Sequence, residues 1–182
     1  MTLETTDREV LEAARLPLAD LASLMRLPAG WAQIPGESAR LARLLRAAVD
    51  QVEAQTGHAT LDRHHVLAGR AGGGPDLSVP LRPLTALVAL EVDGAARPVA
   101  GARLASEGGR GRITLPRPLV AGASVRLVVR AGFATWEAVP AALAHAVLLA
   151  ADALDGERAS PSRVFAARLL APFRELRLRG AH

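Results

Sequence analysis

Few residues of this 182-residue chain could do chemistry, and most of them lie in one stretch. His58, Asp62, His64 and His65 are close together in the sequence, and imidazole and carboxylate groups are common metal ligands. However, His64 and His65 are adjacent, so on a strand their side chains point to opposite faces and cannot share a metal there. A surface or interface role is therefore favoured for these side chains, and no metal site is predicted.

A second pair of polar residues stands in an otherwise apolar segment. His145 and Asp152 are seven positions apart, so they fall on one face of a helix, as a catalytic base and the carboxylate that orients it would. No nucleophile with a recognisable context accompanies them, because neither Ser124 nor Ser160 stands in a nucleophile-elbow pattern. The simpler interpretation is that the two groups satisfy each other or a neighbouring subunit.

The glycine-rich stretch 69–74 is the remaining chemical candidate. It lacks the lysine of a phosphate-binding P-loop and does not lead from a strand into a helix, so we predict a loop between strands. The chain has no cysteine, which excludes disulfides and thiolate metal sites. These observations predict a protein that is not an enzyme and that uses no cofactor or metal.

The charges are distributed unevenly along the chain. All 22 basic residues are arginine, and the formal net charge is +4. Residues 1–20 are mainly acidic, whereas 97–130 carries seven arginines against Glu107, and 163–182 carries five against Glu175. This asymmetry fits an acidic partner surface or a nucleic-acid channel. The alternative is a solvated face in a chain rich in arginine and alanine.

Helical periodicity appears near both ends of the chain. The clearest helix is predicted over 37–56, where apolar residues recur at helical spacing and Gly57 stands at the C-cap position. A shorter helix is predicted between Pro17 and Pro28. A third helix is predicted to begin at Pro140 and to run to about 155. It is apolar almost all round, so neighbouring elements must cover it. A fourth is predicted over 163–170.

Between these helices the pattern changes to that of strands. Leu84, Ala86, Val88, Leu90 and Val92 alternate along one predicted strand. The dipeptide at 93–94, Asp-Gly, then predicts a hairpin turn. A second hairpin is expected around 107–111, and a further strand over 124–130. Together these segments predict a small antiparallel β module.

The predicted fold class is α+β, a small bundle of about four helices interrupted by an antiparallel β insertion. The expected divisions are 1–58 for the N-terminal helices, 59–133 for the β insertion, and 134–182 for the C-terminal helices and tail, in one structural domain. No signal peptide and no apolar run long enough to span a bilayer are visible. Synthesis in the cytoplasm and no membrane partner are therefore expected.

Several short segments, in their order, resemble those of a known family. Thr56-Gly57 ends an amphipathic helix, and a proline-punctuated segment at 79–84 leads into the alternating strand. The segments 128–133, 139–149 and 169–174 then follow. From about Leu18 to Arg177 the chain resembles the head–tail connector (adaptor) proteins of long-tailed bacteriophages and gene transfer agents. It departs from them at 153–157, where relatives usually carry an aromatic and a basic residue, and at 1–16, which has no counterpart.

The resemblance implies a structural role at the head–tail junction of a virion or particle. Such subunits form a ring, dodecameric in relatives, between the portal protein and the stopper or tail proteins. They help to retain packaged DNA and provide a path for its exit, which implies non-specific DNA contact in the channel. The alternative is a nucleic-acid-binding protein that uses the β module as its platform. The modest net charge and the few aromatic residues argue against that alternative.

The C-terminal segment, 163–179, is expected to supply the main docking surface for the portal. Apolar anchors surrounded by arginine and aromatic side chains are typical of interface hot spots. The residues expected in this interface are Arg168, Leu169, Leu170, Phe173, Arg174, Leu176, Arg177 and Arg179. The alternative is that Phe173 and Leu176 fold back onto the subunit's own helices.

Overall fold

The computed structural model describes residues 3–107, 110–156 and 161–173, and the chain divides into two compact units. The β unit combines the described residues up to Val10 with those of 61–135. The helical unit combines 11–60 with the described residues from 136 onward. The α+β class is confirmed, but the strands amount to far more than an insertion in a small helical bundle, because they form two antiparallel sheets.

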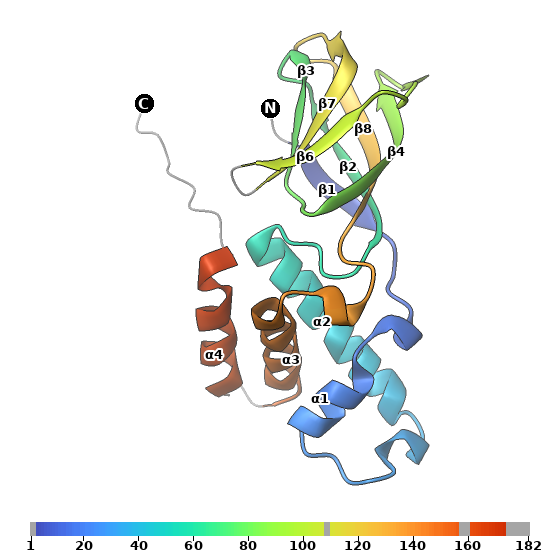
Figure 1. Ribbon diagram of the computed structural model, residues 1–182. Helices are drawn as coiled ribbons and strands as arrows, with labels where there is room; N and C mark the ends of the chain where they lie inside the picture. The colour runs from blue at the N-terminus through green and yellow to red at the C-terminus, as the bar shows by residue number, and fades with distance from the viewer. Residues whose placement is uncertain (1–2, 108–109, 157–160, 174–182) are drawn as a thin grey trace. The chain divides into compact units, whose positions relative to one another are not determined.

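The β unit contains one five-stranded and one three-stranded sheet among its described residues (Figure 1). The larger sheet has the strand order β1-β2-β8-β4-β5, and the smaller has the order β3-β7-β6. The strands are β1 (Leu3–Arg8), β2 (Arg63–Arg70), β3 (Gly74–Val79), β4 (Leu84–Val92), β5 (Ala95–Arg97), β6 (Arg103–Glu107), β7 (Arg110–Leu119) and β8 (Ser124–Ala131).

Alternation along the strands gives each sheet one buried face. Leu67, Leu127 and Val129 of the larger sheet are fully buried, as are Leu77 and Ile113 of the smaller one. Burying one such side chain contributes roughly 1.5–3 kcal/mol. The intervening residues, such as Arg126 and Arg130 on β8, are exposed. This core fixes which side chains of the β unit face outward.

The predicted hairpins form, with one departure in β4. Asp93 and Gly94 have φ angles of 50° and 78° and join β4 to β5, as the Asp-Gly signal predicts. β6 pairs with β7 across the second expected hairpin, whose residues 108–109 lie outside the described ranges. A register shift between Leu87 and Ala89 interrupts the predicted alternation, and Val88 is consequently 45% exposed.

The N-terminal region differs from the expected run of helices over 1–58. Residues 3–8 form strand β1, which pairs antiparallel with β2 and places Leu3 opposite Gly69 and Arg8 opposite His65. Leu3 is buried by this pairing. Sequence reasoning missed the strand because its partner lies about sixty residues away, and its own residues show only one inward apolar side chain.

The helical unit contains four α-helices among its described residues: α1 (Leu18–Leu24), α2 (Glu37–Thr56), α3 (Ala141–Asp155) and α4 (Pro161–Leu170). Four short 3-10 turns, η1 (Ala13–Arg15), η2 (Trp31–Gln33), η3 (Trp136–Ala138) and η4 (Ala171–Phe173), accompany them. α3 packs against both α2 and α4, and Figure 1 shows it beside α4. No helix in the described part of the chain is long and apolar enough to cross a membrane.

The apolar character of α3 is explained by its neighbours. Leu143 and Val147 are fully buried, and they are complemented by Leu41 and Leu45 on the apolar face of α2. The predicted C-cap glycine of α2, Gly57, has a left-handed φ of 68°. The packing of α2 with α3 forms the core of the helical unit and supplies the cover that the apolar sequence of α3 requires.

One arginine joins the start of α2 to the end of α3. Arg40 donates to Glu37 at 3.0 Å through Nε and also pairs with Asp155. The hydrogen bond from Arg40 lowers the pKa of Glu37, and these carboxylates raise the pKa of Arg40. The two helix ends are therefore held by charge as well as by apolar contacts.

Candidate assembly surfaces

The predicted docking segment begins with α4, which has one buried and one exposed face. Ala166 and Leu170, four positions apart, are buried within the helical unit, and Leu170 is only 2% exposed. Arg168 is exposed and Leu169 is half-buried. Leu170 thus contributes to the unit's own core and is not an exposed anchor.

The turn that follows α4 packs against its own unit. The Phe173 ring lies edge-on to the His58 ring, with 5.2 Å between centroids and an interplanar angle of 85°. For Phe173, the structure therefore shows the fold-back arrangement that the sequence left as the alternative. Of the other expected interface residues, Arg174, Leu176, Arg177 and Arg179 lie outside the described residues.

Two apolar side chains on α4 are more exposed than the expected anchors that the structure describes, Leu169, Leu170 and Phe173. Val164 is 56% exposed and Phe165 is 54% exposed. A signal was available in the sequence, because apolar residues at 164 and 165 cannot share the buried face that 166 and 170 occupy. Large apolar side chains exposed side by side mark a surface that a partner covers.

A small groove adjoins the same helix. It has a volume of about 230 Å³ and lies among α2, α3 and α4. Ala167 of α4 and Leu154 of α3 contribute to its lining, and Leu154 is 41% exposed. The outer part of the helical unit therefore offers apolar surface beyond α4 itself.

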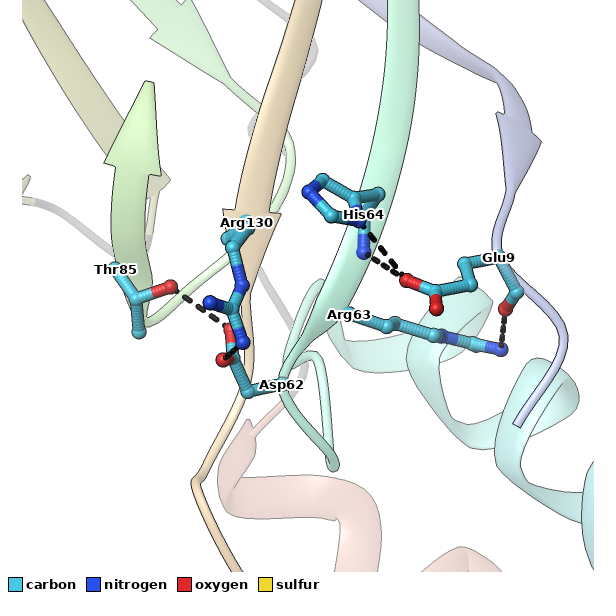
Figure 2. A network of polar contacts seen from close by, with 6 residues as sticks. All are labelled: Glu9, Asp62, Arg63, His64, Thr85 and Arg130. Atoms are coloured by element: carbon cyan, nitrogen blue, oxygen red, sulfur yellow. Dashed lines mark hydrogen bonds and ion pairs between the residues drawn. The ribbon is translucent and has the colours of Figure 1, made fainter. Parts of the chain in front are cut away.

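The polar residues around the start of β2 form the network drawn in Figure 2. Glu9 Oε2 lies 3.0 Å from His64 Nδ1 and accepts the backbone N–H of His64 at 3.1 Å. Arg63 Nη1 donates to the backbone carbonyl of Glu9 at 3.0 Å. Asp62 accepts from Thr85 Oγ1 at 2.8 Å and from Arg130. These contacts fasten the end of β1 and the Asp62 loop to the larger sheet.

The four residues that are close together in the sequence, His58, Asp62, His64 and His65, have different surroundings in the structure. His64 faces solvent and His65 is fully buried, as adjacent strand residues should be. Asp62 bonds Arg130, and His58 belongs to the helical unit, where it contacts Phe173. Asp62 is paired with Arg130 and Thr85, and Glu9 is paired with His64, so these contacts join elements of the β unit together.

The remaining chemical candidates also have structural places. Asp152 accepts from Ser162 Oγ at 2.6 Å, which links α3 to α4, and His145 is exposed. Within the described residues, His145 and Asp152 form no hydrogen bond or ion pair with each other. The glycine-rich stretch ends β2 and turns into β3, with φ angles of +89° at Gly73 and +86° at Gly74.

Three arginines of the β unit are paired with carboxylates. Arg112 pairs with Asp76 at 2.7 Å and Arg126 pairs with Glu91 at 3.2 Å, each across neighbouring strands. Arg130 pairs with Asp62. These pairs offset the charge of three of the seven arginines in 97–130, and they weaken the alternative of a nucleic-acid platform.

Comparisons of the sequence and comparisons of the structure with known proteins gave different results. No protein-family model matches the sequence, and no curated protein matches it significantly. Solved structures do match, over the full length of the chain and 99% of the matched chains.

The matched chains come from particles of one kind. A chain of the "Virion of native gene transfer agent (GTA) particle" is 29% identical, with a TM-score of 0.76. A chain of the "Neck of empty GTA particle computed with C6 symmetry" is 32% identical, with a TM-score of 0.73. A chain of the "Neck of native GTA particle computed with C12 symmetry" is 29% identical, with a TM-score of 0.69.

Proposed function

We propose that this chain, which belongs to the head–tail connector (adaptor) protein family of long-tailed bacteriophages and gene transfer agents, is the adaptor subunit between the portal and the stopper or tail. The chain is a structural component of the neck of such a particle. The observation that carries the proposal is its 32% identity, over full length, to a chain of a gene transfer agent neck.

In this role the copies assemble into a ring within the particle. The neck neighbours were computed with C6 and C12 symmetry, which supports ring assembly. We extend this to twelve copies around the path of the exiting DNA, where exposed arginines would make non-specific phosphate contacts. The role is mechanical, and the paired carboxylates around β2 serve it by holding the β unit together.

The portal contact is assigned to the exposed face of α4 and the basic segment that follows it. Val164 and Phe165 supply apolar area, and Arg168 supplies charge beside them. Arginine and aromatic side chains around apolar anchors dominate interface energies. Leu170 and Phe173 pack within the helical unit and support this face from inside. We propose that the portal contact also includes Leu169, Arg174, Leu176, Arg177 and Arg179.

Co-purification with the portal protein tests the assignment. The double variant Val164→Ser/Phe165→Ser should fold, because both side chains are largely exposed, and it should lose portal binding at least tenfold, an amount equal to about 1.4 kcal/mol. Ile34→Ser is the matched control, since Ile34 is also exposed and lies in the helical unit but outside α4.

A truncation separates α4 from the segment beyond it. Removing 174–182 keeps Phe173 and its contact with His58, so a folding defect is not expected. If the truncated chain and the double variant both bind the portal as the wild type does, the assigned surface is wrong. If only the truncation binds normally, the contact is confined to α4.

A further inference from the structure

A groove of about 490 Å³ opens in the β unit where β4, β5 and β7 end. Apolar side chains form most of its lining, among them Leu90, Val92 and Leu115. Arg97, Arg117 and Asp93 also line it, and all three are exposed. The Asp93 carboxylate accepts the backbone N–H of Ser124 at 2.8 Å. Within the part of the chain that the structure describes, neither guanidinium has an ion-pair partner. The groove therefore suits a segment that is apolar at its centre and acidic beside it.

The rim of the groove carries the most exposed large apolar side chain of the described residues. Val120 lies in the β7–β8 turn and is 79% exposed. Exposure of that extent leaves most of an apolar side chain in water, and a contact that covered it would be favourable.

A segment with the required chemistry lies at the end of β1. Val10 is 72% exposed, the second most exposed large apolar side chain of the described residues. Asp7 and Glu9 precede it, and both are exposed. The Glu9 carboxylate remains 54% exposed while it holds His64, so it can still face a positive group.

The groove of one copy is out of reach of its own Val10. β1 and β5 are opposite edges of the larger sheet. Arg8 pairs with His65, which lies opposite Val129, whereas the groove lies beside Val92, opposite Val125. Three strand spacings and four residues along the strands correspond to roughly 20 Å. The groove and the acidic segment thus lie at opposite corners of one sheet, so a contact between them requires two copies of the chain.

Cyclic rings require such a pair of faces. Every subunit of a ring presents two different surfaces, each complementary to the other surface on its neighbour. We infer that the segment Asp7–Val10 of one copy docks into the groove of the next, with Val10 against the apolar lining and the carboxylates facing Arg97 and Arg117. This inference rests on the ring assembly of the proposed function and names the contact that closes it.

The absence of cysteine from the chain permits a direct test. The full-length double variant Val10→Cys/Val120→Cys is oxidised mildly with diamide over a range of protein concentrations. Because the contact joins different surfaces, the expected product is a reducible ladder of dimers, trimers and larger species. Val10→Cys/Val88→Cys is the control, since Val88 is exposed on β4 but does not line the groove, and it should give no such ladder.

Charge reversal examines the electrostatic part of the contact. Adding Arg97→Glu and Arg117→Glu to the cysteine pair should raise the protein concentration needed for half-maximal ladder formation about tenfold or more. Arg103→Glu should not change it, because Arg103 is an exposed arginine of the same unit outside the groove.

The outcomes distinguish this contact from the proposed function. If the protein sediments as a ring, or is found in the particle neck, but gives no ladder, the inference is wrong and the proposed function still stands. A preparation that stays monomeric without a ladder also overturns it. A ladder from a chain that is absent from the neck supports the contact and contradicts the proposed function. Binding of a different protein in the groove, with no ladder, assigns the groove to that protein and overturns the inference.

Discussion

In the helical unit one arginine, Arg40, joins two helix ends, whereas in the β unit three arginines each join neighbouring parts of the sheets through a carboxylate. Helices satisfy their own backbone and need only apolar faces to pack. Strands leave one face outward, and there cross-strand charge pairs hold the register. Three of the seven arginines in the stretch 97–130 are thus held by carboxylates of the same unit.

The two units also differ in where apolar surface remains exposed. In the helical unit Val164 and Phe165 stand together on α4, at the end of the chain that we assign to the portal. In the β unit Val10 and Val120 stand at opposite corners, which suits contact between copies. A ring subunit needs both kinds of surface, one shared with its neighbours and one for the next component of the particle.

The largest expected effects come from emptying either core. Leu45 of the helical unit and Leu127 of the β unit are both fully buried. Leu45→Ala or Leu127→Ala should each lower the free energy of unfolding by about 2–5 kcal/mol. Leu104→Ala should cost clearly less, because Leu104 is only half-buried on the edge strand β6.

Hydrogen exchange shows whether the two units respond separately. Leu45→Ala should speed exchange in α2 and α3, and Leu127→Ala should speed exchange in β2, β4 and β8. Equal acceleration throughout the chain by either variant would contradict the division into two units as a division in stability.

A substitution at one glycine of the β unit should have an effect of similar size. A Cβ on Gly132 would lie 2.3 Å from the backbone carbon of Leu61, at a φ of +122°. Gly132→Ala should therefore destabilise the β unit by roughly 2–5 kcal/mol. Gly94→Ala is the control, because Gly94 also has a positive φ but nothing lies within 4 Å of its Cβ position.

Thermal unfolding followed by circular dichroism measures both glycine variants. Gly94→Ala should cost only about 1–2 kcal/mol from backbone strain. Similar losses from the two variants would mean that the approach of residue 132 to the Leu61 backbone is not tight.

Prediction from the sequence was correct for features set by neighbouring residues and wrong for features that depend on distant residues. The bounds of α2 and the Asp93-Gly94 turn are set by neighbouring residues, and both are found as predicted. β1 depends on a distant partner strand, and the exposure of Val88 depends on a bulge in the pairing of β4 with β8. Local periodicity carries no information about either feature.

The same distinction applies to the docking surfaces, which the sequence predicted only in part. Composition singled out 163–179, and the packing shows that Leu170 and Phe173 turn inward while Val164 and Phe165 turn outward. The groove could not be predicted, because its lining comes from β4, β5 and β7 and the turns beside them. Its acidic counterpart was visible in the sequence as an excess of carboxylates near the N-terminus.

The smallest expected effect is a pH dependence of the β unit. Asp76 accepts from Arg112 at 2.7 Å and from Thr114 at 2.6 Å, and these hydrogen bonds lower its pKa. A lowered pKa stabilises the fold above the ordinary aspartate pKa of about 3.9, and this contribution is lost as the pH falls through the folded-state value.

Asp76→Asn removes that contribution. The wild type should exceed the variant in melting temperature at neutral pH, and the difference should shrink as the pH falls below about 4. Arg117→Gln changes an exposed arginine without a carboxylate partner in the described residues and should show no such convergence. A difference between wild type and Asp76→Asn that is constant with pH would rule out the carboxylate as its cause.

The central claim, that this chain is the ring-forming adaptor of a particle neck, is tested most directly by cryo-electron microscopy of particles from the producing cell. The account predicts a ring of this fold between the portal and the tail, with twelve copies and with α4 facing the portal. Particles whose neck lacks this fold, or that carry the chain elsewhere, would contradict the account.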